Sequence, residues 1–201
     1  MLARGARTGP LILLTMLLAA CAARPVRVHE PTARSWPERL RALQALEHFE
    51  LGGRLAASNG TDAFSAGVHW RQQGEDAVID LSGPLGLGAA HIVRHGASLS
   101  VTNAQGVVYR GSPAGEQMAS TLGFDPPLAS LRYWVLGVPD PARPADEKLD
   151  PGRQRLSALE QDGWRIDYGD YVAVGSEWLP ARLTLERADV RVKLLVDDWQ
   201  S

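Results

Sequence analysis

The sequence predicts a mainly β (α+β) fold: a meandering antiparallel sheet interrupted by helices. Short segments of alternating apolar residues recur along the chain, separated by turns about every eight to twelve residues. The apolar period changes to that of a helix near residue 35 and again in the middle of the chain. Such a sheet either curls into a barrel plugged by helices, which leaves an apolar hollow, or packs as a filled sandwich. The strand pattern allows both.

Residues 1–20 have the organisation of a bacterial lipoprotein signal peptide. Arg4 and Arg7 precede an apolar run over residues 11–18, which is shorter than the ~20 residues of a membrane-spanning helix. The run ends in Leu-Ala-Ala before Cys21, the single cysteine of the chain. Lipoprotein-processing enzymes read this pattern, so it predicts acylation of Cys21. The alternative is an ordinary secretory signal with a chance cysteine beside its cleavage site.

A chain processed in this way would begin at Cys21 with three acyl chains, and stable membrane anchoring takes at least two. Residues 21–34 contain two prolines and scattered charge without a period, so we expect a flexible tether. Residues 35–201 are expected to form one domain. Ala22 follows the cysteine, whereas aspartate there retains lipoproteins in the inner membrane of enteric-type bacteria; the outer membrane is therefore favoured.

Charge and cysteine usage exclude some classes of function. Loss of Arg4 and Arg7 with the signal would change the formal net charge from −2 to −4, because residues 1–20 hold no acidic side chain. A mildly acidic domain is a poor nucleic-acid binder. With Cys21 acylated, no thiol remains for disulfides or thiolate chemistry, so the fold must depend on its core.

The first half of the domain begins with a helix and continues as strands. The helix is predicted to begin near Ser35, with Pro37 in its first turn and with Leu40 and Leu43 on one side. Asn59-Gly60 is a hairpin turn signal. The predicted strands are 49–56, 64–71, 77–81, 90–94, 99–101 and 107–109.

The middle of the chain predicts two more helices before the strands resume. One covers residues 113–122, and the other begins at Pro126-Pro127 and ends at Gly137. Its apolar side carries Leu128, Leu131, Trp134 and Val135. Residues 138–151 carry four prolines and mixed charge, which predicts a loop. The last predicted strands are 155–159, 164–168, 179–185 and 190–196.

No constellation of residues points to catalysis. His91 and His95 have a spacing that suits metal binding on a helix, but they fall on a predicted strand and its turn, which favours a surface role. The glycine-rich run over 83–88 lacks the Lys-Ser/Thr of a phosphate loop. The sequence therefore predicts no enzyme, no metal and no cofactor.

The segment over residues 81–90 is apolar where a loop between strands is normally polar. It carries no charge and places Leu85 and Leu87 among glycines. Two interpretations stay open. The leucines fold back onto the core, or they form an exposed apolar tip that contacts a membrane or a partner.

Six tryptophans are spread over the chain: Trp36, Trp70, Trp134, Trp164, Trp178 and Trp199. They either pack in the core and at interfaces or, together with aliphatic residues on the inward strand faces, line a cavity for an apolar ligand. The candidate cavity residues are Leu55, Trp70, Ile79, Leu81, Leu131, Trp134, Trp164 and Leu183.

Several short blocks resemble the LolB family of outer-membrane lipoprotein receptors. They are Phe-Glu-Leu-Gly-Gly-Arg-Leu (49–55), Trp-Arg-Gln (70–72), Leu-Ser-Gly-Pro-Leu-Gly (81–86), Leu-Arg-Tyr-Trp-Val-Leu-Gly-Val-Pro (131–139), Gln-Asp-Gly-Trp-Arg-Ile-Asp-Tyr (161–168), Leu-Pro (179–180) and Val-Lys-Leu-Leu-Val-Asp-Asp-Trp (192–199). The blocks keep the order of the family and cover nearly all of the chain after Cys21. Leu87-Gly88 departs from it, because polar residues are expected after the Pro-Leu-Gly turn.

The resemblance implies a half-open antiparallel β-barrel closed by helices over an apolar cavity, as in LolA and LolB. It implies a monomer anchored in the outer membrane and facing the periplasm. The protein would accept lipoproteins from the periplasmic carrier LolA and insert their acyl chains into the inner leaflet of that membrane. In the family a leucine on a protruding loop matters for release, and it matches Leu85. The implied membrane-insertion loop is Pro84, Leu85, Gly86 and Leu87.

Three other functions remain open at this point. A lipid-anchored binder of lipids or other apolar ligands that keeps its cargo predicts a cavity but no dependence on Leu85. A lipoprotein that only scaffolds an envelope complex predicts a filled core. An enzyme predicts a polar cleft with a perturbed titratable group.

Overall fold

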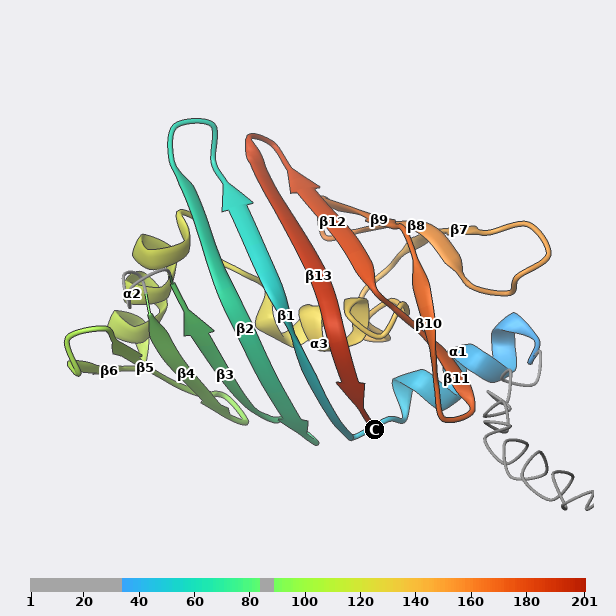
Figure 1. Cartoon of the computed structure of the whole chain (residues 1–201), viewed down its shortest axis with the longest axis horizontal. Helices are drawn as coiled ribbons and strands as arrows, with labels where there is room; N and C mark the ends of the chain where they lie inside the picture. Colours follow the sequence, from blue (N-terminus) through green and yellow to red (C-terminus); the bar gives the residue numbers. More distant parts are fainter. Residues whose placement is uncertain (1–33, 84–88) are drawn as a thin grey trace, which may run out of the picture.

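The computed structural model describes residues 34–83 and 89–201. Its main feature is an antiparallel sheet of eleven strands that curves around the helices, with a two-stranded hairpin beside it (Figure 1). In chain order the elements are α1 (Trp36–Gln44), β1 (His48–Ser58), β2 (Ala63–Gln73), β3 (Asp76–Ser82), β4 (Ala90–His95), β5 (Ser98–Asn103), β6 (Val108–Arg110), α2 (Ser112–Leu122), α3 (Leu128–Trp134), β7 (Asp146–Leu149), β8 (Leu156–Gln161), β9 (Trp164–Tyr168), β10 (Tyr171–Val174), β11 (Glu177–Pro180), β12 (Arg182–Arg187) and β13 (Val190–Gln200).

Some predictions fall on residues 1–33 and 84–88, outside the described residues. They concern the signal peptide, acylation of Cys21, and the tether apart from Arg34. They also concern the insertion loop of Pro84, Leu85, Gly86 and Leu87. Within residues 34–83 and 89–201, no helix is long and apolar enough to cross a membrane.

The strand order is β6-β5-β4-β3-β2-β1-β13-β12-β9-β8-β7, with every neighbouring pair antiparallel. The last strand of the chain, β13, therefore pairs with the first, β1, at the centre of the sheet. Among the described residues, the edge strands β6 and β7 do not pair with each other, so the barrel is half open. The predicted fold class is confirmed.

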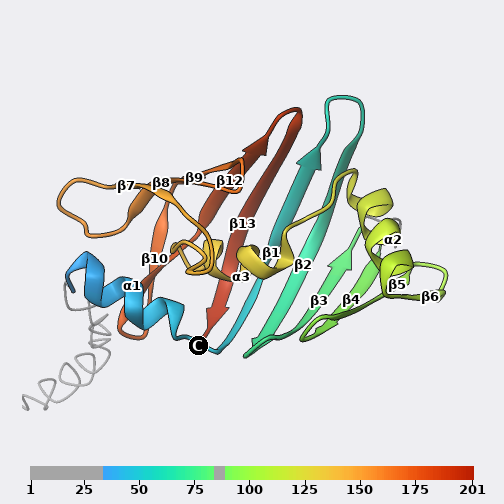
Figure 2. The ribbon, with the colours of Figure 1, turned by 180° about the vertical axis from the view of Figure 1, so that it is seen from behind.

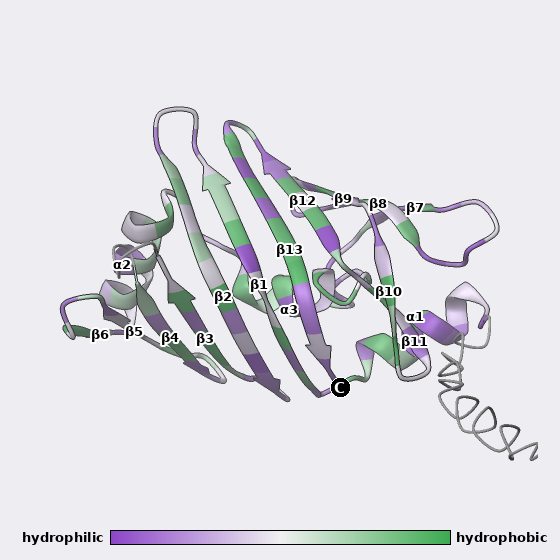
Figure 3. Ribbon diagram, viewed as in Figure 1, coloured by the Kyte–Doolittle hydropathy of each residue, from purple (hydrophilic) through white to green (hydrophobic). Residues whose placement is uncertain are grey.

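Both later helices lie on the inner face of this sheet. Figure 2 shows α3 in front of the central strands and α2 beside β5 and β6, on the side toward which the sheet curves. Along the strands, hydrophobic and hydrophilic residues alternate (Figure 3). On β13, for example, Val192 and Leu194 are buried while Arg191 and Lys193 are exposed. The alternation puts one apolar face toward the helices and one charged face toward water.

A β-bulge bends the two central strands. The register between β1 and β13 shifts between Gly52 and Gly53, and Asp197 is the extra residue on β13. A Cβ at Gly53 would overlap the carbonyl oxygen of Leu195, so this close approach requires glycine. Bulges bend strands and increase their twist, which here contributes to the curvature of the sheet.

The first helix covers the end of the sheet away from α2. Ser35 and Glu38 form a capping box, and Pro37 lies in the first turn as predicted. Leu43 is buried. The guanidinium group of Arg39, also buried, donates to the Trp178 carbonyl oxygen and pairs with Glu177 at 3.3 Å, which joins α1 to the β10–β11 hairpin.

His91 and His95 lie on the same exposed face of β4. His95 is the last residue of β4 rather than part of its turn, so His91 and His95 both point outward. Each lies beside an aspartate of β3, with His91 Nδ1 2.6 Å from Asp80 and His95 Nδ1 2.8 Å from Asp76. Among the described residues, no group of three His, Cys, Asp or Glu side chains could hold a metal ion.

Two element predictions were wrong, and one strand was missed. The segment 179–185 forms two strands, because Pro180 has no N–H for a ladder and β11 pairs with β10 instead of the main sheet. The predicted loop over 138–151 contains the edge strand β7, whose mixed charges hide any alternation. The strand β10 was not predicted; it is four residues long and lies outside the main sheet.

We expect Gly53→Ala to lower the free energy of unfolding by about 2 kcal/mol or more, because its Cβ meets backbone that cannot move without breaking the bulge. Gly52→Ala is the matched control, since its Cβ would lie 4.0 Å from its nearest neighbour, the Cβ of Asp198. It should leave stability unchanged or raise it slightly. Urea unfolding of both variants measures the difference, and equal losses would contradict this explanation of the bulge.

Candidate functional site

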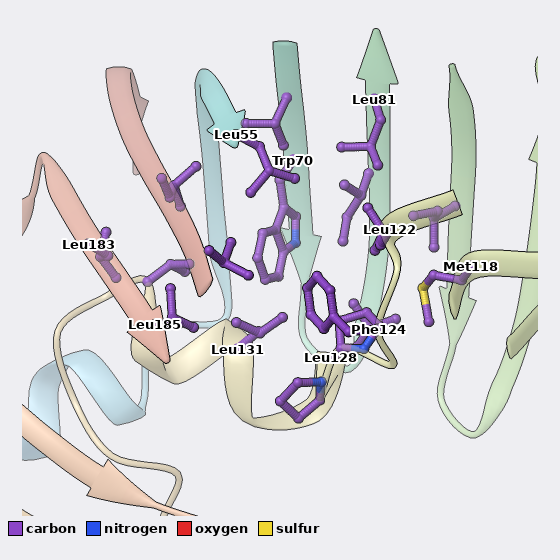
Figure 4. Close-up of a pocket in the computed structure, with 18 of the residues that line it drawn as sticks. Leu55, Trp70, Leu81, Met118, Leu122, Phe124, Leu128, Leu131, Leu183 and Leu185 are labelled. Atoms are coloured by element: carbon purple, nitrogen blue, oxygen red, sulfur yellow. The ribbon is translucent and has the colours of Figure 1, made fainter. Parts of the chain in front are cut away.

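An apolar cavity lies between the inner face of the sheet and the segment that connects α2 to α3 (Figure 4). No polar atom faces its interior. The sheet contributes Leu55, Val68, Trp70, Ile79, Leu81, Ile92, Trp164, Leu183, Leu185, Val192 and Leu194. The helical side contributes Met118, Leu122, Phe124, Pro126, Pro127, Leu128, Leu131 and Val135.

The strand register gathers the sheet side of the wall. Inward residues of neighbouring strands lie directly opposite one another, as Trp70 does with Ile79 and Leu183 with Leu194. Because the side-chain period of a strand is two, a shift of one residue in either pair would turn the whole apolar row to solvent. The cavity wall therefore follows from the same alternation that specifies the sheet.

The helical side is held at one end by buried polar groups. Arg132 Nη1 donates to the Gly74 carbonyl oxygen at 2.6 Å, and Trp134 Nε1 donates to Gln161 Oε1 at 2.7 Å. Burial raises the pKa of Tyr168 well above its usual value. Its hydroxyl therefore stays protonated, and it donates to the Trp134 carbonyl oxygen at 3.1 Å. The C-terminal end of α3 is thus fixed to the sheet.

The connecting segment over residues 123–127 is held much less firmly. Gly123 ends α2 in the left-handed conformation, and Pro126-Pro127 offer no N–H. Among the described residues, the one hydrogen bond to this segment from the sheet and its turns runs from Asn59 Nδ2, in the turn between β1 and β2, to the Gly123 carbonyl oxygen at 3.2 Å. Phe124 packs against the Trp164 ring with their centroids 5.8 Å apart. Apolar contact is therefore the main force that keeps this segment closed.

The cavity is small in this conformation. Its volume is about 90 Å³. An engineered apolar protein cavity of about 150 Å³ is large enough for benzene. A long acyl chain needs far more room than benzene, so it can enter only if part of the wall moves.

Of the eight candidate cavity residues, the structure brings seven to this cavity: Leu55, Trp70, Ile79, Leu81, Leu131, Trp164 and Leu183. The eighth, Trp134, is fully buried behind it, where it binds Gln161. Twelve further lining residues were not predicted, among them Met118, Leu122 and Phe124. The apolar positions of the predicted helix 113–122 were the available signal for the first two.

Residues 47–199 match the family model of the outer membrane lipoprotein LolB. The chain belongs to the LolB family. The outer-membrane lipoprotein LolB of Nitrosococcus oceani is 32% identical over 197 residues, which cover 96% of this chain and 97% of that protein. The LolB of Nitrosomonas europaea is 35% identical over 190 residues, covering 93% of this chain and 89% of the relative. The resemblance seen in the sequence blocks is confirmed.

Solved structures show the same fold. A LolA superfamily protein from Nitrosomonas europaea superposes with a TM-score of 0.53 at 10% identity, covering 84% of this chain and 94% of that one. A DUF1329 family protein from Desulfovibrio piger gives a TM-score of 0.56 at 10% identity, covering 82% and 90%. At 10% identity these two likenesses show that the fold is shared.

We expect Gln161→Leu to cost about 3 kcal/mol of unfolding free energy, because Gln161 accepts from both Trp134 Nε1 and the Asp140 backbone N–H, at 2.7 and 2.9 Å. Each buried donor left without a partner costs about 1–3 kcal/mol. Glu160→Gln, at the exposed neighbouring position, is the control and should change stability by less than about 0.5 kcal/mol. Similar midpoints for the two variants in urea would rule out this anchoring role.

Proposed function

We propose that this protein is the outer-membrane receptor that takes lipoproteins from a LolA-type periplasmic carrier. It inserts their acyl chains into the inner leaflet of the outer membrane. It would be anchored by acyl chains on Cys21 and face the periplasm. The observation that carries this proposal is a wholly apolar cavity on the inner face of a LolB-family sheet. A cavity without polar groups suits a hydrocarbon chain and little else.

The energetics of acyl chains favour a direct handover. Burying one methylene group contributes about 0.8 kcal/mol, so moving a sixteen-carbon chain from apolar surroundings into water costs about 12 kcal/mol of free energy. Release into water would therefore be very slow. If carrier and receptor present their cavities to each other, the chain passes between apolar surroundings, and its direction depends only on relative affinities.

Uptake requires the cavity to grow, and the connecting segment 123–127 is the part of the wall that supports such a movement best. It covers the cavity with Phe124, and within the described residues its one hydrogen bond to the sheet side of the cavity comes from Asn59 in the β1–β2 turn. The opposite, C-terminal end of α3 is fixed by Arg132 and Trp134. Movement of the segment away from the sheet would open the cavity while the strand register stays intact.

Delivery is proposed to depend on the loop of Pro84, Leu85, Gly86 and Leu87. The segment between β3 and β4 carries no charge, so its leucines can enter the headgroup region without burying a polar side chain. A binder that keeps its cargo would need the cavity but not this loop. The two functions therefore differ in what a charged residue at position 85 does.

We expect Leu85→Glu to accept cargo and fail to deliver it, because a carboxylate enters the bilayer at high cost. The test loads LolA with a labelled lipoprotein, adds the chain from Ala22 onward, and measures acceptance and then insertion into liposomes. Gln105→Glu, at an exposed turn position outside this loop, adds the same charge and should behave as wild type. Normal insertion by Leu85→Glu would favour a binder that keeps its cargo. Failure of the wild-type chain to take cargo from LolA would overturn the receptor function.

We expect Asn59→Asp to take up acyl ligands faster, by about two- to thirteenfold. The substitution keeps the oxygen that accepts from the Thr61 and Asp62 N–H groups but removes the donor to Gly123. A net hydrogen bond of about 0.5–1.5 kcal/mol sets the size of the effect. Stopped-flow uptake of a fluorescent fatty acid measures it, with Asp62→Asn as the control for charge in the same turn. An unchanged rate would show that this hydrogen bond does not hold the segment closed.

A further inference from the structure

One buried donor on a residue of the cavity wall has no partner, and it is not exposed to the cavity in this conformation. Among the described residues, four buried side-chain nitrogen atoms lack a hydrogen bond: Nε of Arg39, Arg132 and Arg155, and Nε1 of Trp164. Each arginine has other polar or aromatic contacts for its guanidinium group. The indole N–H is the only side-chain donor of Trp164, and the residue is 1% exposed.

The other buried tryptophans show that this fold normally satisfies an indole. Trp70, which also lines the cavity, donates to Gln72 Oε1 at 2.9 Å. Trp134 donates to Gln161, and Trp199 to the Pro180 carbonyl oxygen at 3.0 Å. A buried N–H without a partner costs free energy, and a native fold rarely keeps one unless it has a use.

The register places Trp164 at one end of the cavity. It is the first residue of β9, and its neighbour Arg165 lies opposite Glu186, near the turn that joins β12 to β13. The exposed Arg187 of β12 places its guanidinium carbon 4.7 Å from the Trp164 ring centroid. Trp164 therefore lies where the apolar wall meets the polar rim, and the connecting segment covers its ring through Phe124.

We infer that the Trp164 N–H donates a hydrogen bond to the carbonyl oxygen at the head of a bound acyl chain, whether ester or amide. The inference rests on the proposed function. A purely apolar cavity cannot fix which end of a chain faces the rim, and this hydrogen bond would fix it. Ester and amide carbonyls are acceptors that an alkyl chain carries at one end only. Outward movement of Phe124 would free the ring and make room for the carbonyl.

The test compares two ligands and two variants of the chain from residue 21 onward, with Cys21→Ala so that no anchor competes for the cavity. Methyl decanoate and an alkane of matched length displace a fluorescent apolar dye. Trp164→Phe should bind the ester about tenfold more weakly and the alkane within twofold of wild type. Trp70→Phe removes an N–H that is already satisfied, so its effect on the two ligands should be equal.

A second readout needs no variant. In the ¹⁵N–¹H spectrum of the Cys21→Ala chain, the indole signal of Trp164 should shift downfield when methyl decanoate binds and not when the alkane binds. Two results would overturn the inference and leave the receptor function standing. One is an equal loss of affinity for both ligands in Trp164→Phe, and the other is an indole signal that does not shift when the ester binds. If neither ligand displaces the dye from the Cys21→Ala chain, the cavity does not bind acyl ligands. The proposed receptor function then fails, and this inference fails with it.

Discussion

The curved sheet has an apolar inner face that cannot be left in water, and the rest of the structure follows from covering it. The side chains of seven neighbouring strands face one hollow, from β4 at one side to β9 at the other. At about 25 cal/mol per Å² of buried apolar surface, even partial exposure would be costly for a domain of marginal stability. The helices α2 and α3 supply the cover, and because the sheet is half open they can do so without forming part of it.

The two parts of the cover are held by different kinds of contact, and this difference links the fold to the function. Polar groups fix α3 where Trp134 and Arg132 reach the ends of strands, whereas the segment around Phe124 rests on apolar contacts that an acyl chain could replace. Apolar contacts are nondirectional, so a hydrocarbon chain substitutes for Phe124 with little loss of free energy. A buried hydrogen bond has no such substitute. The protein thus keeps a folded frame while one part of its wall can exchange for cargo.

Local patterns predicted most of the fold, and long-range pairing explains what they missed. Strand β9 lies at its predicted bounds, and the helix after Pro126-Pro127 and the hairpin at Asn59-Gly60 are present. The break after Pro180 depends on a partner, β10, that lies apart from the main sheet. At the site, Trp134 was placed on the cavity side of α3 by helical period alone. Its actual partner, Gln161, is distant in sequence, so no local pattern could have shown it.

The unpaired indole of Trp164 marks the limit of pattern-based reasoning. Apolar alternation placed this residue with Leu183 and Trp70 among the candidate cavity residues, but alternation does not show whether a donor is satisfied. In the same fold Trp70 has an acceptor two residues away, and Trp164 has none within the described chain. An acyl carbonyl would complete the hydrogen bonding of this wall, and methylene groups would fill its volume. The unsatisfied N–H destabilises the empty protein, and a hydrogen bond to the ligand's carbonyl would remove this cost when the head of the chain reaches the rim. That gain would contribute to the free energy of binding.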